Sequence, residues 1–287
     1  MEPPVFRPPS EADSLILQVT IGCSHNRCTF CGMYTTKAFR VKTSTEIQAD
    51  IDEALAMFGP DVRRVFLADG DAMCLSSRRL IEILDLLNNA FPHLQRVGIY
   101  ANARDVLSKT DDDLAELNRR KLRMLYVGLE SGDAKTLSAI DKPATPDEMV
   151  ESVQKARRAG MTTSVMVLIG LAGVEHSLEH ARLSADAINE MAPDFTALLT
   201  YTPVPGTVLG DRILSGDADL PTPRGSLEEI AAFVQALECR TYFTCNHASN
   251  YLPMTGRMPQ AKARMLDDLA AALAGDRPIK PEFLRGL

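Results

Sequence analysis

The chain has 287 residues, 45 % of them hydrophobic and 24 % charged, which is the composition of a globular protein with a sizeable core. Its formal net charge of −7 argues against a general affinity for nucleic acid, which requires a basic surface. The first residues, Met-Glu-Pro-Pro, do not resemble a secretory signal, and no apolar stretch approaches the length of a membrane span. We therefore expect a cytoplasmic protein with reduced cysteines and no membrane partner.

The chain alternates between strand-like and helix-like segments. Residues 1–14 are expected to form an extended arm, because four of them are prolines. Further along, apolar residues recur at the helical period in some segments and form short β-branched runs in others. The expected strands are 15–20, 65–68, 97–101, 124–129, 162–169 and 195–202, and the expected helices are 45–58, 78–91, 111–120, 146–159 and 175–191. Thr110 is the predicted N-cap of one helix, and Gly160 is expected to follow the end of another.

This alternation predicts an α/β fold with a parallel sheet and right-handed crossovers. Six strands fit a partial (β/α)6 barrel of the TIM type better than a closed eight-strand barrel or an open doubly wound sheet, because residues 206–225 are loop-like. Residues 226–287 are predicted to form two helices separated by an irregular polar segment at 241–256. The expected organisation is an arm at 1–14, a barrel core at 15–210 and a helical C-terminal extension at 211–287.

Three of the six cysteines lie within nine residues, directly after the first expected strand. Cys23, Cys28 and Cys31 have the spacing C-x4-C-x2-C. Loops at the carboxyl ends of parallel strands build the active sites of such folds, and three clustered thiolates need a soft metal partner. A zinc ion would require a fourth ligand, such as His25 or a distant cysteine. An iron–sulfur cluster held by three cysteines would keep one iron open, and the short loop favours the cluster.

This loop, with the aromatic Phe30 before its last cysteine, resembles that of the radical S-adenosylmethionine (radical SAM) superfamily. The usual spacing there is C-x3-C-x2-C, so this chain has one extra residue between Cys23 and Cys28. The resemblance implies that the three cysteines hold a [4Fe–4S] cluster. It also implies S-adenosylmethionine (SAM) as the second cofactor.

Four further segments resemble the same superfamily, and they follow the second, fourth, fifth and sixth strands in order. Asp69, Gly70 and Asp71 resemble the loop that meets the SAM amino group, although Gly-Gly-Glu is the common form. Glu130 and Ser131, within Gly-Leu-Glu-Ser-Gly, imply contacts with the SAM ribose or polar end, and Gly170 opens a stretch that would lie along the adenine. Pro203 begins a Pro-x-Pro-Gly-Thr turn that is common in the superfamily.

The resemblance implies an enzyme that cleaves SAM reductively. An electron donor such as flavodoxin or ferredoxin would reduce the cluster. The 5′-deoxyadenosyl radical would then abstract hydrogen from an unidentified small-molecule or peptide substrate. Two alternatives remain open: a zinc-stabilised α/β binding protein, and an iron–sulfur electron carrier without SAM chemistry.

A polar segment between the two C-terminal helices is the expected cover of the open barrel. It contains Asn246, His247, Asn250 and Tyr251, and we predict that it contributes to substrate handling, with His247 and Tyr251 as candidate catalytic residues. A loop that satisfies only its own backbone is the alternative. The remaining cysteines, Cys74, Cys239 and Cys245, are expected to be buried small side chains.

Overall fold

An eight-stranded, mostly parallel sheet organises the chain. The computed structural model describes residues 1–286, and in it the strand order is β1-β4-β5-β6-β7-β8-β9-β10. The six expected strands are β1 (Leu15–Gln18), β4 (Arg64–Ala68), β5 (Arg96–Ala101), β6 (Leu122–Glu130), β7 (Thr162–Ile169) and β8 (Phe195–Thr200). This confirms the predicted α/β fold with a partial barrel, because β1 and β10 remain as two sheet edges within the described residues.

The five expected helices are present within two residues of their predicted bounds. They are α1 (Ser44–Phe58), α2 (Ser77–Ala90), α4 (Asp111–Arg119), α6 (Pro146–Arg158) and α7 (Ser177–Met191). Thr110 caps α4 as predicted, since its side chain accepts from Asp113 N–H. Gly160 has a φ of 81° just after α6, where a left-handed residue ends a helix.

Several elements were not expected from the sequence. They are β2 (Thr20–Ile21), β3 (Arg40–Val41), β9 (Tyr242–Thr244), β10 (Thr255–Arg257), α3 (Ala103–Leu107), α5 (Ala134–Ala139) and α8 (Val208–Ser215), with 3-10 turns at Pro9–Glu11, Ala72–Cys74 and Glu282–Leu284. The predicted loop at 206–225 is therefore wrong, because Thr207 caps α8 by accepting from Gly210 N–H. The segment 241–256 is also not wholly irregular, because β9 pairs parallel with β8 and antiparallel with β10. The two expected C-terminal helices are α9 (Pro223–Ala236) and α10 (Lys262–Ala274).

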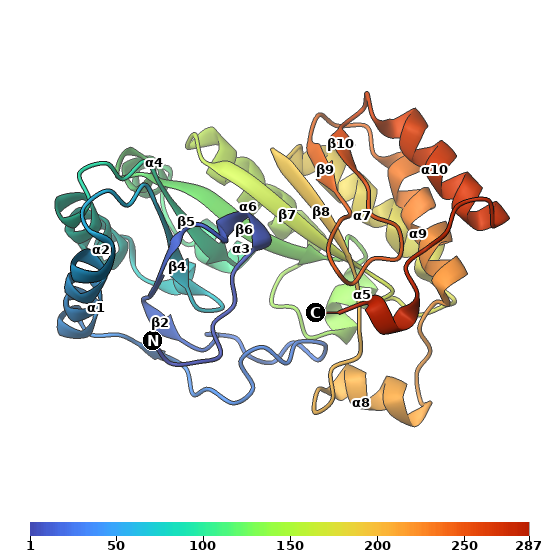
Figure 1. Cartoon of the computed structure of the whole chain (residues 1–287), viewed down its shortest axis with the longest axis horizontal. Coiled ribbons are helices and arrows are strands. Elements are labelled where there is room, and N and C mark those ends of the chain that lie inside the picture. The colour runs from blue at the N-terminus through green and yellow to red at the C-terminus, as the bar shows by residue number, and fades with distance from the viewer. Residues whose placement is uncertain (287) are drawn as a thin grey trace. The chain divides into compact units, whose positions relative to one another are not determined.

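The chain divides into two compact units, which are described separately. Unit 1 comprises Met1–Asn26, Met33–Val127 and Ser152–Thr163, and unit 2 comprises Arg27–Gly32, Gly128–Glu151 and the residues from Ser164 onward. In unit 1, α1 and α2 pack together, and in unit 2, α9 packs against both α7 and α10 (Figure 1). Within residues 1–286, none of the helices combines the length and apolarity needed to cross a bilayer.

In unit 1 the N-terminal residues form part of the core. Glu11 is fully buried and accepts hydrogen bonds from Tyr126 Oη at 2.6 Å, from Arg96 at 2.7 Å and from the Ser14 hydroxyl. Gly98 in β5 makes room for this carboxylate, since a Cβ there would lie 2.9 Å from Glu11 Oε1. A buried carboxylate stabilises the fold only when its hydrogen bonds are satisfied, so Glu11 needs these three donors.

Candidate functional site

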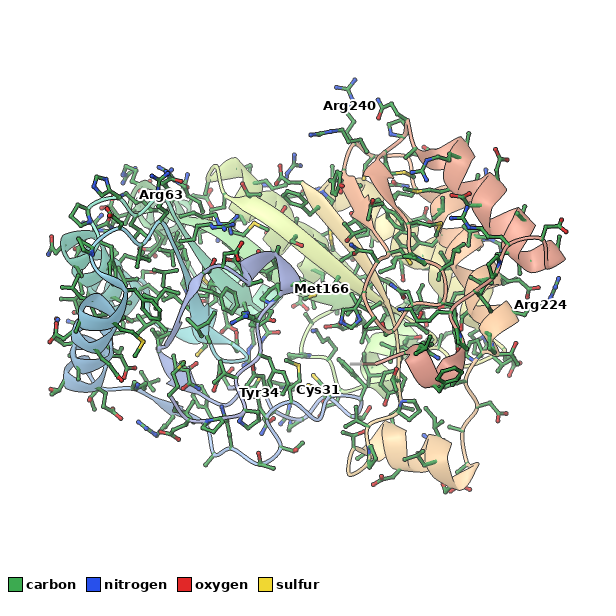
Figure 2. The ribbon with its side chains drawn as sticks, viewed as in Figure 1. Cys31, Tyr34, Arg63, Met166, Arg224 and Arg240 are labelled. Atoms are coloured by element: carbon green, nitrogen blue, oxygen red, sulfur yellow. The ribbon has the colours of Figure 1, made fainter. Side chains whose placement is uncertain are left out.

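The second half of the cysteine loop belongs to unit 2 and is fixed by backbone hydrogen bonds. Thr29 N–H donates to the Ile140 carbonyl at 2.9 Å, and the Thr29 carbonyl accepts from Leu209 N–H at 2.9 Å. Cys31 N–H donates to the Cys28 carbonyl at 3.1 Å, so both cysteines belong to one tight turn. Figure 2 labels Cys31 on this loop. The fixed backbone holds both thiols in defined positions.

The three thiols of the cysteine loop are soft donors of the kind that an iron–sulfur cluster binds. Cys23, Cys28 and Cys31 are half-buried, and none of the six cysteines forms a disulfide. Within residues 1–286, no three His, Cys, Asp or Glu side chains converge as the ligands of one metal ion would. Three thiolates are soft donors, and a [4Fe–4S] cluster would bind each of them through a different iron.

In unit 1, Cys23 faces a glycine that permits close approach. A Cβ at Gly70 would lie 3.0 Å from Cys23 Cβ and 2.5 Å from the Tyr34 ring, so a larger residue would displace one of them. Gly22, just before the cysteine, has a φ of 78°, in the left-handed region that favours glycine. The backbone around Cys23 is therefore shaped by two glycines.

Asp69 braces the start of the cysteine loop. Its Oδ2 accepts from Gly22 N–H at 3.0 Å, from Gln18 at 3.1 Å and from Lys37 Nζ at 2.9 Å. The charged side chains of Lys37 and Asp69 are both nearly inaccessible to solvent. This carboxylate thus faces the protein through Oδ2, and it holds the residue before Cys23 in place.

Asp71 lies one residue beyond Gly70 and has an oxygen to spare. Its Oδ2 accepts from the Ser24 hydroxyl and lies 3.6 Å from Arg104. Its Oδ1 is fully buried without a hydrogen-bond partner among the described residues. A buried carboxylate oxygen without a donor is costly, and an ammonium group of a ligand would satisfy it.

Two ionisable groups beside Asp71 have strongly perturbed pKa values. Burial, reinforced by the charge of Asp71, raises the pKa of the Cys74 thiol to about 12. Burial and the same carboxylate raise the pKa of Asp105 to about 7. Cys74 therefore stays a neutral thiol at neutral pH, but it and Cys239 are only half-buried, so the expectation of burial holds for Cys245 alone.

In unit 2, Glu130 ends β6 in a strained backbone conformation. Its φ of 62° places a non-glycine residue in the left-handed region. Its Oε1 accepts from Lys142 Nζ at 2.9 Å, and both side chains are almost buried. Burial alone would lower the pKa of Lys142, but Glu130 and the thiolates of Cys28 and Cys31 raise it above its ordinary value. Lys142 is therefore a cation close to both cysteines.

Ser131 and Gly170 form turns at the ends of β6 and β7. Ser131 is fully buried, and its hydroxyl accepts from Asp133 N–H at 2.9 Å. Gly170 has a φ of 94°, so a side chain there would be strained. Gly173 N–H donates back to the Gly170 carbonyl at 3.2 Å and closes the turn.

A pocket of about 280 Å³ lies at the ends of β7 and β8 in unit 2. Gly170, Tyr201, Pro203 and Tyr251 are among its lining residues. Tyr201 packs edge-to-face on Phe30, with ring centroids 6.4 Å apart. Burial raises the pKa of Tyr201, and the nearby charge of Cys31 adds to the effect. The pocket therefore adjoins the cysteine loop through Tyr201 and Phe30.

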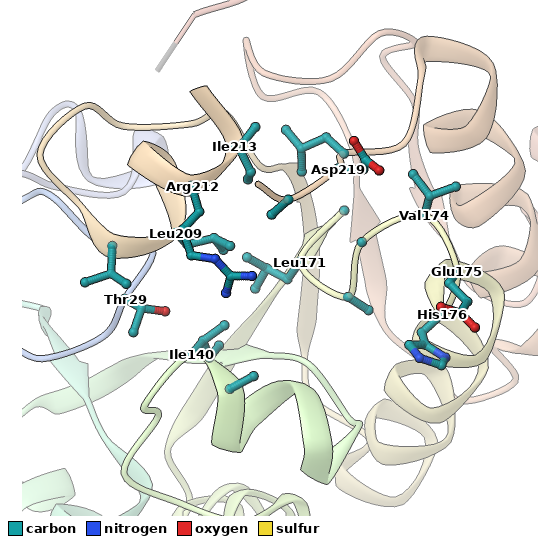
Figure 3. Close-up of a pocket in the computed structure, with 17 residues that line it drawn as sticks. Thr29, Ile140, Leu171, Val174, Glu175, His176, Leu209, Arg212, Ile213 and Asp219 are labelled. Carbon is teal, nitrogen blue, oxygen red and sulfur yellow. The ribbon is translucent and has the colours of Figure 1, made fainter. Parts of the chain in front are cut away.

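A larger pocket, of about 460 Å³, lies on unit 2 between the Gly170 turn and α8. In Figure 3, Arg212 extends from α8 toward Leu171 and Ile140. The walls of this larger pocket are mainly apolar, and Gly170 lines both pockets. The Gly170 turn is thus a wall shared by two cavities.

The polar side chains of the segment before β10 differ in burial and in their partners. Asn250 is fully buried, accepts from Thr200 Oγ1 at 2.9 Å and donates to the Leu198 carbonyl at 2.8 Å. His247 contacts its own loop, because its Nδ1 lies 2.9 Å from the Ser249 hydroxyl. Asn246 is exposed. Asn250 is therefore bonded to the end of β8 and His247 to its own loop, while Asn246 faces solvent.

Tyr251 differs from its neighbours because it lines the smaller pocket. Its hydroxyl donates to Glu282 at 2.7 Å, and the guanidinium of Arg285 lies 4.1 Å from its ring centroid. Arg285 also donates to the Ser249 carbonyl at 2.6 Å. The C-terminal residues are therefore fastened over this pocket by side chains that the sequence analysis did not single out.

Lys142 was also missed by sequence reasoning. It follows Asp141 and precedes Pro143 in a short loop, where a lysine is ordinarily solvated. Only its pairing with Glu130 reveals its place beside the cysteines. Nothing in the sequence distinguishes it from Lys135, which lies closer to the Glu-Ser-Gly turn and is exposed.

Comparison with known proteins supports a single family. The model of the radical SAM superfamily matches residues 17–183, which is more than half of the chain. An uncharacterized protein of Methanopyrus kandleri is 24 % identical over 200 residues, which cover 64 % of this chain and 37 % of that protein. The chain therefore spans little more than a third of the length of this curated relative.

Solved structures show the same fold at low sequence identity. Methylornithine synthase aligns with a TM-score of 0.54 and 17 % identity, over 79 % of this chain and 63 % of that one. Coproporphyrinogen III oxidase from Escherichia coli gives 0.57 and 20 %, over 77 % and 52 %. A radical SAM methyltransferase from Kitasatospora setae, solved with cobalamin and a [4Fe–4S] cluster, gives 0.58 and 17 %, over 71 % and 39 %.

The C-x4-C-x2-C loop lies within the matched residues. The cofactors of this superfamily are a [4Fe–4S] cluster and SAM, as the sequence analysis expected. The chain belongs to the radical SAM superfamily.

Proposed function

We propose that this protein cleaves SAM reductively and uses the product radical to take a hydrogen atom from a substrate that is not yet identified. The observation that carries the proposal is the buried pair of Glu130 and Lys142, in which the strained Glu130 ends a strand and Lys142 lies near Cys28 and Cys31. Strain and buried charge concentrate at functional sites.

Cys23, Cys28 and Cys31 are the proposed ligands of the cluster. When bound, the cluster would take one electron from the donor and pass it to the sulfonium of SAM, which would supply the chemistry that breaks the C5′–S bond to give methionine and a hydrogen-abstracting 5′-deoxyadenosyl radical. Lys142 offsets the negative charge of the thiolates, because an unpaired buried charge would be costly. An electron donor such as flavodoxin or ferredoxin is the proposed partner.

The remaining roles are assigned within each unit. In unit 1, Asp71 offers its unpaired Oδ1 to the ammonium group of SAM, while Asp69 and Gly70 shape the loop around Cys23. In unit 2, Glu130 and the Ser131 turn accept the ribose hydroxyls.

The smaller pocket of unit 2 is the proposed place of the adenosine group. Gly170, Tyr201 and Pro203 line it, and Phe30 packs on the ring of Tyr201. Tyr251 and His247 are the proposed substrate residues, the former because it lines this pocket. Exclusion of water from this pocket would protect a radical from side reactions.

The test replaces each loop cysteine by alanine singly and reconstitutes the protein anaerobically with iron and sulfide. We expect each variant to fall well below about four irons per chain and to make no 5′-deoxyadenosine with dithionite. Cys245→Ala is the matched control, because Cys245 is fully buried and burial raises its pKa to about 12.

Retention of iron, sulfide and SAM cleavage in any one of the three variants would remove that residue from the ligand set. A wild-type protein that holds the cluster but forms no 5′-deoxyadenosine would be an electron carrier instead. A colourless, zinc-containing protein would favour the binding-protein alternative.

A further inference from the structure

The turn after β6 is attached to helix α7 in unit 2. Gly132 N–H donates to Ser184 Oγ at 2.8 Å, and Ser184 is fully buried. A Cβ at Gly132 would lie 2.2 Å from the Leu183 carbonyl oxygen, so the turn presses directly on the helix. Glu130 is therefore positioned two residues from a fixed contact with α7.

The turn after β7 is attached to the same helix through a second side chain. Gly170 N–H donates to Glu229 Oε1 at 3.0 Å, and the same oxygen lies 2.8 Å from His180 Nδ1. Both side chains are completely buried. Glu229 comes from α9, which packs against α7.

His180 and Ser184 are four residues apart on α7, so they lie on one face of the helix. That face therefore meets the turn after β6 through Ser184 and the turn after β7 through His180 and Glu229. Because a helix is rigid over one turn, the two contacts fix the separation of the two strand-end turns.

Stability alone is a poor reason for these polar side chains. His180 Nε2 and Glu229 Oε2 are buried without a hydrogen-bond partner among the described residues. Replacing a buried polar pair by apolar residues of similar volume is often neutral or stabilising. The buried His180–Glu229 pair is better explained by the hydrogen bond that Glu229 accepts from the Gly170 amide.

We propose that Ser184, His180 and Glu229 are positioning residues, which set the distance between the Glu130 turn and the Gly170 turn. This proposal rests on the proposed function, in which the two turns hold the ribose and the adenine of SAM. Ser184 and Glu229 lie beyond residue 183, where the match to the family model ends. Two of the three positioning residues therefore lie outside that match, and His180 lies within it.

The first test measures amide hydrogen–deuterium exchange in the apo protein, which needs neither cluster nor SAM. In Glu229→Leu, and in the double variant His180→Leu/Glu229→Leu, we expect the Gly170 amide to exchange at least about tenfold faster. In Ser184→Ala the Gly132 amide should respond in the same way. Glu229→Gln keeps an acceptor and should restore the slow exchange of Gly170.

The matched control is Thr196→Val, which also removes one fully buried hydroxyl hydrogen bond, that to Thr241 at 2.9 Å, but at the start of β8. It should leave both glycine amides unchanged. Unchanged exchange at Gly170 in the Glu229→Leu variants would contradict the proposed positioning role of Glu229. If those variants do not fold, Ser184→Ala decides, because it removes only a hydroxyl.

The second test measures the dissociation constant of SAM for cluster-replete variants. We expect about tenfold weaker binding in Glu229→Leu and in Ser184→Ala, and near wild-type affinity in Glu229→Gln and Thr196→Val. Faster amide exchange with unchanged SAM affinity would support the positioning of the two turns and contradict the proposed SAM contacts. Unchanged amide exchange would contradict the positioning role and would not affect the proposed function.

Discussion

Lys142 Nζ lies 2.9 Å from Glu130 Oε1, and the two side chains are only 7 % and 11 % exposed. The pair joins a loop residue to the end of β6. Because both charges are nearly desolvated, each depends on the other far more than a surface pair would.

Removing the cation should therefore destabilise the protein. We expect Lys142→Met to lower the free energy of unfolding of the apo protein by about 3 kcal/mol, because Glu130 becomes an unpaired buried charge. Urea denaturation measures the loss. Lys135→Met, on the exposed face of α5, is the control and should change stability by less than about 0.5 kcal/mol. Equal losses in the two variants would mean that Glu130 does not need its partner.

Glu130→Gln tests the role of the carboxylate separately. The substitution keeps the shape and an acceptor oxygen but removes the charge, so we expect the cluster to remain. SAM affinity should fall about tenfold, because a charged acceptor binds hydroxyl donors more strongly than an amide. Calorimetry on cluster-replete protein gives the affinity, and iron analysis checks the cluster. Unchanged affinity in a protein with full iron content would assign Glu130 to another task.

Asp105 should make stability depend on pH. Its pKa of about 7 in the folded protein is above its ordinary value of 3.8, so the folded state holds the proton more tightly. The resulting stability is full below about pH 4 and is lost as the pH rises through about 7. Asp105→Asn removes this dependence. Near pH 8 its free energy of unfolding should exceed that of the wild type by on the order of 2 kcal/mol.

Thermal unfolding between pH 5 and 8 measures this difference. Asp112→Asn, an exposed residue of α4, should keep the wild-type profile. A wild-type melting temperature that does not fall across this range would show that Asp105 ionises without cost.

The C-terminal residues should loosen when Arg285 is removed. Its guanidinium stacks on Tyr251 and bonds to the Ser249 carbonyl, so Arg285→Ala loses both contacts. We expect faster hydrogen exchange and faster proteolysis of residues 280–286. Arg240→Ala is the control, since Arg240 is exposed and its side chain projects from the protein in Figure 2. Equal protection in the two variants would mean that the tail is held by its backbone alone.

His247→Ala separates substrate handling from SAM cleavage. The His247 imidazole is hydrogen-bonded to Ser249 of its own loop, and burial lowers the pKa of His247, so the neutral imidazole prevails at neutral pH. We expect the cluster and the substrate-independent formation of 5′-deoxyadenosine to persist, while turnover of the true substrate falls. Unaltered turnover would make His247 a loop residue alone.

Periodicity was sufficient to predict the six long strands and the five helices between them, because each buries a continuous face. It failed for α8, where Gly210 and Gly216 lie within or next to a helix of eight residues. It also failed for β9 and β10, because three residues are too few to establish an alternation.

The candidate site was predicted to a different extent. The cysteine motif and the order of the strand-end turns were enough for the family. Lys142, Glu229 and Arg285 could not be found in this way, because each owes its place to a partner distant in the fold rather than to its neighbours in the chain. Long-range burial of a charged residue leaves no periodic mark in the sequence.

The buried carboxylate of Glu11 has a consequence for the order in which the chain can fold. Its partners Arg96 and Tyr126 follow it by 85 and 115 residues, so its hydrogen bonds cannot form until much of unit 1 has been synthesised. Unit 1 also includes Ser152–Thr163, which is made after the first part of unit 2. Contacts of such sequence separation slow folding. Until they form, the buried carboxylate of Glu11 lacks these two donors, and a nascent chain that stalls before residue 126 would expose the segment around Glu11 to proteases and chaperones.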